Sequence, residues 1–308
     1  MNKLTKYGLT ALAGSLVATS VSAGEMAVSG GWSWSYDSAD SDESGNPMSM
    51  GNSVTFTGSG ETDQGWTATY KMELDHGYSG YDDQSLTLDM GDSGKLVFSG
   101  ASVTPGGIHM VNDIVPAADT PVYSMTDTGT AYGIARGAGA TSNLSYTLSF
   151  GDVTVSAEMM KGAGTDRSYG VKYTGVEGLT LVAGQSDINP GRVAGETQET
   201  TFGASYAVAG ATIAYQITDV DYPGTGAADE DSTHIGASFA VNDDLSVSYA
   251  TQSTDITGKG EDETVSGFGI SYSMGSMSVA AYAGKTENGN GVSTADDEGK
   301  GLTLSIAF

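Results

Sequence analysis

The chain has 308 residues, including 45 glycines and no cysteine, and its formal net charge is −26. This glycine share is about twice the usual value and argues against long helices, and the lack of cysteine excludes disulfides and thiol chemistry. An acidic chain without a basic face is not expected to bind nucleic acid. No run of about 18 apolar residues is present to form a membrane-spanning helix.

The first 23 residues have the pattern of an export signal. Lys3 and Lys6 form a basic start, residues 9–21 are apolar but too few to span a bilayer, and Val21-Ser22-Ala23 is a small-residue cleavage site. We expect residues 1–23 to be removed, leaving 24–308 as a single domain; the alternative is a buried N-terminal helix. Removing two lysines and no acids changes the net charge from −26 to −28.

The remaining chain consists of segments in which every second residue is apolar, which is the signal of a half-buried strand. The last segment stops on the aromatic Phe308, as expected for a strand that ends at a membrane interface. About sixteen such segments occur, an even number within the range of single-chain membrane barrels. They span residues 28–36, 54–56, 66–74, 86–90, 96–98, 144–150, 153–159, 169–173, 179–183, 202–208, 211–217, 235–241, 245–249, 268–274, 277–283 and 302–308.

Short and long connections alternate between these strands. Tight turns such as Gly151-Asp152 and Gly275-Ser276 are typical of hairpins. This parity predicts an antiparallel up-and-down barrel, with turns on one side and loops on the other. The long polar connections are 37–50, 75–83, 101–141, 162–167, 186–199, 219–232, 252–263 and 285–299.

The second face of each strand is polar, as shown by Lys71 and Glu73 among threonines, and by Glu158 next to Thr154 and Ser156. Such residues suit a water-filled lumen and would make a poor dry core. A soluble barrel has the reverse arrangement, and alternation alone does not separate the two. The export signal, the terminal aromatic and the strand number favour the transmembrane version, and sixteen strands leave an aqueous channel.

The longest connection, residues 101–141, is expected to fold into the lumen and narrow it. Its apolar residues Ile108, Val111, Ile114 and Val115 are able to pack against the wall, and long loops in compact folds are usually functional or disordered. The alternative is an external lid or an added hairpin around residues 130–135.

Taken together, the export signal, about sixteen strands, a long third external loop, the terminal Phe308 and the segment Leu144–Glu158 resemble the general porins of Gram-negative outer membranes, especially the alphaproteobacterial type. The resemblance implies a homotrimeric, water-filled channel in the outer membrane lipid that passes ions and small hydrophilic solutes by passive diffusion. It also implies a constriction where loop acids face wall bases. The candidate residues are Asp113, Asp119, Asp127 and Arg136 on the loop, and Lys71, Glu73, Lys95, Glu158 and Lys172 on the wall.

Acids greatly outnumber bases, so a cation-preferring pore is expected, because carboxylates attract cations in a narrow aqueous space. No cofactor is expected, although the loop acids Asp229, Glu230 and Asp231 offer hard oxygen ligands for a structural Ca²⁺. No motif places a nucleophile beside a base, so the chain is not expected to be an enzyme. The alternatives are a substrate-specific channel and a non-conducting surface or adhesive barrel.

Overall fold

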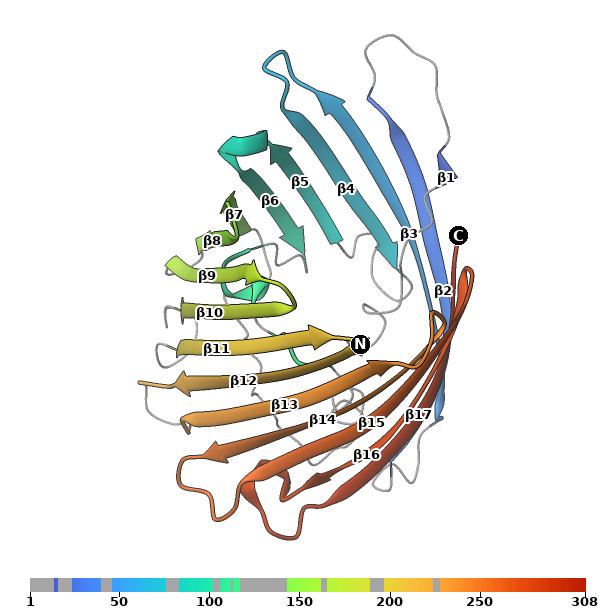
Figure 1. Ribbon diagram of the computed structural model, residues 1–308, viewed down its shortest axis with the longest axis vertical. Coiled ribbons are helices and arrows are strands. Elements are labelled where there is room, and N and C mark those ends of the chain that lie inside the picture. Colours follow the sequence, from blue (N-terminus) through green and yellow to red (C-terminus); the bar gives the residue numbers. More distant parts are fainter. Residues whose placement is uncertain are drawn as a thin grey trace.

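Sixteen antiparallel strands close into one barrel in the described part of the computed structural model (Figure 1). The structure describes residues 14–15, 24–39, 46–75, 83–101, 106–111, 113–116, 143–161, 165–188, 197–223 and 228–308. Strand β2 pairs with β3 on one side and with β17 on the other, which joins the two ends of the sheet. The predicted all-β, up-and-down architecture is confirmed. A two-residue strand, β1 (Gly14–Ser15), also pairs with β2 and lies within the predicted export signal.

The barrel strands follow the predicted series closely, and most extend beyond them. Their bounds are β2 (Met26–Ala39), β3 (Met48–Glu61), β4 (Thr67–Asp75), β5 (Asp83–Asp89), β6 (Lys95–Ala101), β7 (Asn143–Phe150), β8 (Val153–Lys161), β9 (Thr165–Val176), β10 (Leu179–Ile188), β11 (Thr197–Val208), β12 (Ala211–Asp221), β13 (Glu230–Ala240), β14 (Leu245–Ile256), β15 (Glu263–Met274), β16 (Met277–Glu287) and β17 (Asp297–Ala307).

The tight turns lie where the parity of the connections predicts them. Two residues join β7 to β8, β9 to β10, β11 to β12 and β15 to β16. Gly178, in the β9–β10 turn, has a φ of 76°, a conformation that a residue with a Cβ rarely adopts. The pairing across such turns sets apolar residues opposite one another, as Phe202 is opposite Ile217, so the apolar series of neighbouring strands share one face of the sheet.

The outer face of the barrel is apolar. Large hydrophobic side chains alternate along the strands and stay exposed: Ile213 is 63% exposed and Phe202 is 53% exposed. A soluble protein rarely leaves so much contiguous apolar surface in water. Many aromatic residues lie on this face, namely Tyr70, Phe98, Tyr146, Phe150, Tyr169, Tyr206, Tyr215, Phe239, Tyr249, Phe268 and Tyr272. No helix in the described part of the chain is long and apolar enough to span a membrane.

The inner face is polar, and its buried residues are mostly serine, threonine, glutamine and acids. Small apolar clusters form on this face where part of the longest connection packs against it. That part begins with the short helix η3 (Gly107–Met110), which lies inside the ring of strands beside β8–β10 (Figure 1). Two other short helices, η2 (Gly91–Ser93) and η4 (Gly289–Gly291), belong to connections at the rims.

Candidate functional site

Residues 106–111 and 113–116 of the longest connection, which we call the inner segment, are bound to the inner wall. The amide of Gly107 donates to Ser156 Oγ on β8 at 2.9 Å, and the amide of Ile108 donates to Ser168 Oγ on β9 at 3.2 Å. Both serines are buried and alternate with outward residues such as Ala157 and Tyr169, which places their hydroxyls on the inner face. The first amides of a helical turn have no partner within the turn, and these two wall hydroxyls satisfy them.

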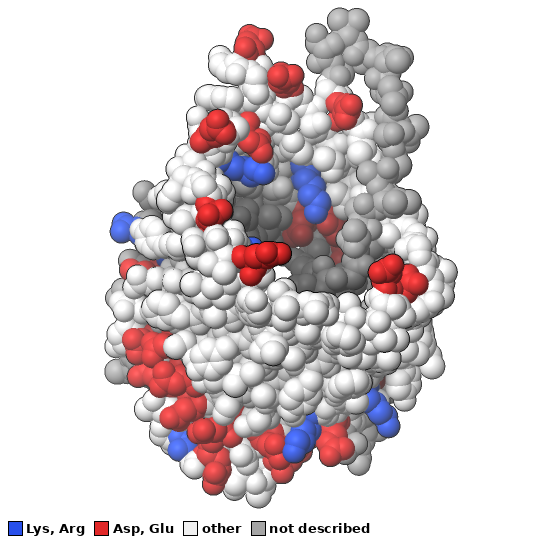
Figure 2. Space-filling model, in the orientation of Figure 1, with Lys and Arg blue, Asp and Glu red and all other residues white. Residues whose placement is uncertain are grey.

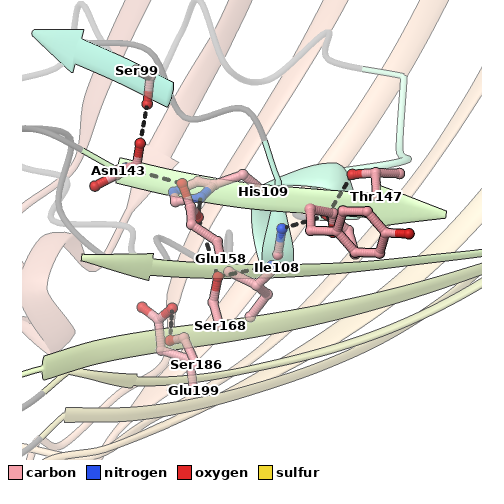
Figure 3. Close-up of polar contacts among 12 residues, drawn as sticks. Ser99, Ile108, His109, Asn143, Thr147, Glu158, Ser168, Ser186 and Glu199 are labelled. Carbon is pink, nitrogen blue, oxygen red and sulfur yellow. Dashed lines mark hydrogen bonds and ion pairs between the residues drawn. The ribbon is translucent and has the colours of Figure 1, made fainter. Parts of the chain in front are cut away.

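Glu158 on β8 is the polar centre of this contact, and Figure 3 shows three side chains converging on it. Its Oε2 lies 2.8 Å from Nδ1 of His109 and accepts a hydrogen bond from Ser168 Oγ at 3.2 Å. Its Oε1 accepts a hydrogen bond from Asn143 Nδ2 at 2.9 Å. Glu158 is 2% exposed, and a buried carboxylate is stable only with such partners. Glu158 therefore holds the inner segment against the wall, and its carboxylate is shielded from the solvent of the lumen.

Residues 113–116 contact the wall farther around the barrel. Gln216 on β12 bridges the inner segment: its Oε1 accepts from the amide of Ile114 at 3.0 Å, and its Nε2 donates to the carbonyl of Val111 at 3.2 Å. The carboxylate of Asp113 lies 3.7 Å from Nδ1 of His234 on β13. The same Asp113 oxygen accepts from the amide of Val115. Asp113 is thus held between its own segment and the wall.

Apolar side chains fill the space between these polar contacts. Ile108, Val111 and Val182 form one buried cluster, with Met110 and Ile114 packed against it. Val115 forms a second cluster with Ala214 and Ala250 of the wall. The prediction that Ile108, Val111, Ile114 and Val115 pack against the wall is confirmed for these described residues.

The wall formed by β4–β6 carries two exposed lysines on its inner face. Lys71 Nζ lies 3.6 Å from Glu73 Oε2, and Lys95 Nζ lies 3.1 Å from Asp89 Oδ2. Figure 2 shows a hollow in the molecule. Lys or Arg side chains and several acids lie at the rim of this hollow, on the side where Figure 1 shows β4–β6. The lysine side chains are 48% and 49% exposed, so solvent reaches them inside the barrel, and each is next to a carboxylate.

The other predicted site residues are more dispersed. Lys172 lies on the inner side of β9, paired in register with Thr154 and Val182, away from the contacts of Glu158 with the inner segment. Asp119, Asp127 and Arg136 lie outside the described residues. The structure therefore brings Asp113 and Glu158 to the contact of the inner segment with the wall, and it places Lys71, Glu73 and Lys95 on the wall of β4–β6.

The three carboxylates considered for calcium do not converge. Glu230 is buried on the inner face, whereas Asp229 and Asp231 are exposed, because consecutive residues of a strand point to opposite faces. Within the described ranges, no group of three or more His, Asp or Glu residues is arranged to hold a metal ion. Asp231 instead continues an outward row of acids with Asp219 and Asp255, its neighbours across β12 and β14.

Sequence reasoning missed the residues that hold the inner segment from the wall side. Ser156, Ser168, Gln216 and His234 are inward polar residues at alternating positions, and nothing in a strand pattern separates them from other lumen residues. The burial of His109 and His234, whose side chains are 7% and 3% exposed, results from contacts with residues far away in the sequence. His109, for example, meets Glu158 across 49 positions.

Comparison with known proteins gives a family and a set of similar folds. A family model described as Gram-negative porin matches residues 8–291, and no curated protein matches the chain. A porin structure refined at 1.8 Å has a TM-score of 0.70, with 17% identity over 92% of this chain and 100% of its own. The trimer form of the outer membrane protein OmpT of Vibrio cholerae scores 0.68, with 17% identity over 93% and 100%. An anion-selective porin from Comamonas acidovorans scores 0.69, with 14% identity over 92% and 99%.

Proposed function

Because the chain belongs to the Gram-negative porin family, we propose that it is a passive diffusion channel for ions and small hydrophilic solutes, with a preference for cations. Family and fold make it a channel-forming β-barrel of the outer membrane and not an enzyme. The polar inner face and the hollow in the molecule support a passage filled with water (Figure 2).

The observation that carries the cation preference is the pairing of the two lysines on the wall of β4–β6. Lys71 and Lys95 each lie within 4 Å of a carboxylate, so neither adds an uncompensated positive charge to the lumen. Elsewhere on the described inner face, buried acids recur on β11, β13, β15 and β17, at Glu199, Glu230, Glu263 and Asp297. With a net charge of −26 for the whole chain, the field inside the barrel attracts cations.

The proposed constriction is the connection 101–141. Its inner segment lies against the inner faces of strands from β8 to β13 through the contacts given above. This supports a passage between the inner segment and the wall of β4–β6, where Lys71 and Lys95 face solvent. Asp119, Asp127 and Arg136 complete the proposed constriction set.

The proposed assembly is a homotrimer in outer membrane lipid. The apolar outer face supplies a surface for lipid and for other subunits, and a trimer form exists for the Vibrio cholerae protein of similar fold. A structural Ca²⁺ bound by external loops stays a secondary proposal. Asp229, Glu230 and Asp231 do not fit a shared ion, so any such site requires carboxylates from more than one connection.

The test is single-channel recording of the purified, folded protein in a planar bilayer, under a gradient of potassium chloride. We expect discrete conductance steps, grouped in threes for a trimer, and a reversal potential of cation sign. A reversal potential of anion sign, which is the selectivity of the Comamonas acidovorans porin, would overturn the cation preference. Folded protein that never conducts would favour a non-conducting surface barrel. Saturation of the current by one sugar would favour a substrate-specific channel.

A further inference from the structure

The inner wall contains a groove of small residues that matches the path of the inner segment. Four glycines line it, one each on β9, β10, β11 and β13: Gly170, Gly184, Gly203 and Gly236. Pairing between strands links them, because Gly170 pairs with Gly184, and Gly236 pairs with both Ala214 and Ala250. We call these four glycines and two alanines the glycine groove.

Each glycine of the groove lies against a different part of the inner segment. A Cβ on Gly170 would overlap the carbonyl oxygen of Gly107, and one on Gly184 would lie 2.7 Å from Ile108 Cγ1. Separations under 3.0 Å require one of the two groups to move, and a backbone carbonyl cannot rotate away as a side chain can. The inner segment therefore lies closer to the wall than it could if Gly170 and Gly184 carried side chains.

The same relation continues along the second half of the groove. A Cβ on Gly203 would lie 2.8 Å from Ile114 Cδ1, and one on Gly236 would lie 2.5 Å from Val115 Cγ1. Glycine in a strand interior is destabilising relative to alanine. Four such positions on nearby strands, each filled by the inner segment, indicate that close approach of the segment compensates for this cost.

We propose that the glycine groove is the positioning element of the channel: its depth fixes how far the inner segment stands from the wall, and so sets the width of the passage left for solutes. This inference rests on the proposed constriction. The groove residues touch the inner segment, not the solute, and act on permeation only through the position of that segment. The polar contacts of Ser156, Ser168 and Gln216 fix the segment along the groove, and the glycines fix its height above the wall.

The test is a size exchange at Gly236 and Val115. In Gly236→Ala the new methyl group meets Val115 Cγ1, so the inner segment moves toward the opposite wall and the unitary conductance falls. The double variant Gly236→Ala/Val115→Ala removes the closest of these contacts, leaving Ala250 Cβ at 3.1 Å and Pro116 Cδ at 3.3 Å, and returns the conductance most of the way to the wild-type value. Gly60→Ala on β3 is the matched control, because a Cβ there has no atom within 4 Å. The proposal is overturned if Gly236→Ala conducts like the wild type, or if the loss persists unchanged in the double variant.

A second pair of residues, Ile108 and Gly184, keeps the proposal testable if Gly236→Ala fails to fold. The first readout of this experiment is disulfide formation, which does not depend on conduction. The chain has no cysteine, so Ile108→Cys/Gly184→Cys introduces a single possible disulfide, at a site where the Gly184 Cβ position is 2.7 Å from Ile108 Cγ1. We expect this bond to form in the folded barrel and the conductance of this variant to be the same in its oxidised and reduced forms.

Two results of the cysteine experiment would overturn the inference. Failure to form the bond in folded protein, or a conductance that changes when the bond forms, would show that the inner segment does not occupy the groove in the open channel. A third result separates the inference from the proposed function. If the bond forms in a barrel that does not conduct, the groove is occupied and the proposed function is wrong.

Discussion

The hydroxyl of Tyr282 on β16 donates a hydrogen bond to Asp37 on β2, across the intervening strand β17. The two residues are 245 positions apart in sequence and join strands on either side of the position where the barrel closes. The contact is possible because Gly301 on β17 lies beneath it: a Cβ there would be 2.5 Å from the Tyr282 hydroxyl. The tyrosine covers the glycine of the neighbouring strand, a pairing that fixes register in β-sheets.

We expect Gly301→Ala to destabilise the barrel by about 1–3 kcal/mol, the usual range for overpacking. The added methyl group displaces the Tyr282 ring and its hydrogen bond to Asp37. The measurement is the unfolding midpoint in detergent, followed by the β-sheet signal in circular dichroism. Gly60→Ala is the control, since its Cβ meets open space. Equal midpoints for the two variants would show that the Tyr282 contact does not stabilise closure.

Glu158→Ala is expected to release the inner segment from the wall while the barrel stays closed. The substitution leaves His109, Asn143 and Ser168 without their shared acceptor, and each buried group left unsatisfied costs about 1–3 kcal/mol. Limited proteolysis of folded protein, with cleavage sites mapped by mass spectrometry, measures the release. We expect faster cleavage between residues 101 and 141.

Glu158→Gln is the conservative control, because its amide oxygen still accepts hydrogen bonds at the same place. We expect it to be cleaved more slowly than Glu158→Ala. If both variants resist cleavage as the wild type does, the inner segment is held by the glycine groove without help from Glu158.

The strand pattern is sufficient to predict the barrel and insufficient to predict where the inner segment binds. Alternation in a series such as Phe268, Ile270 and Tyr272 depends only on neighbours in the chain, so it can be recognised in the sequence. The contact of Gln216 with Val111 joins residues 105 positions apart, and no local signal carries that information. The four glycines of the groove are visible in the sequence, but a chain with 45 glycines offers no means of selecting them.

Removing a lumen lysine should strengthen the cation preference. In Lys95→Gln, Asp89 loses its partner at 3.1 Å and presents an uncompensated carboxylate to passing ions. Two unit charges 4 Å apart in water interact by about 1 kcal/mol, so the ratio of cation to anion permeability should rise roughly two- to five-fold. The reversal potential under a salt gradient measures this ratio. Lys300→Gln is the control, because Lys300 is exposed on the outer side of β17; an equal shift there would indicate a general effect of net charge.

Adjacent residues of β15 test which face meets the lipid. Ile270 is 40% exposed on the outer face, and Ser271 is the next residue, on the inner face. Ile270→Lys should destabilise the barrel in lipid by about 2–4 kcal/mol if it lies near the bilayer midplane, whereas Ser271→Lys should be tolerated. Folding yield and denaturant midpoint in lipid vesicles report the difference. Greater damage from Ser271→Lys would mean that the polar face is the packed one.

The most direct test of the central claim, that solutes pass between the inner segment and the wall of β4–β6, is chemical block of the current at Lys71. The cysteine-free chain allows Lys71→Cys to be labelled alone by a charged, membrane-impermeant thiol reagent during single-channel recording. Our account predicts that labelling reduces the conductance, and that the same treatment of Lys300→Cys on the outer face leaves it unchanged. A Lys71→Cys channel that is labelled, as confirmed by its mass, and yet conducts as before would contradict this path.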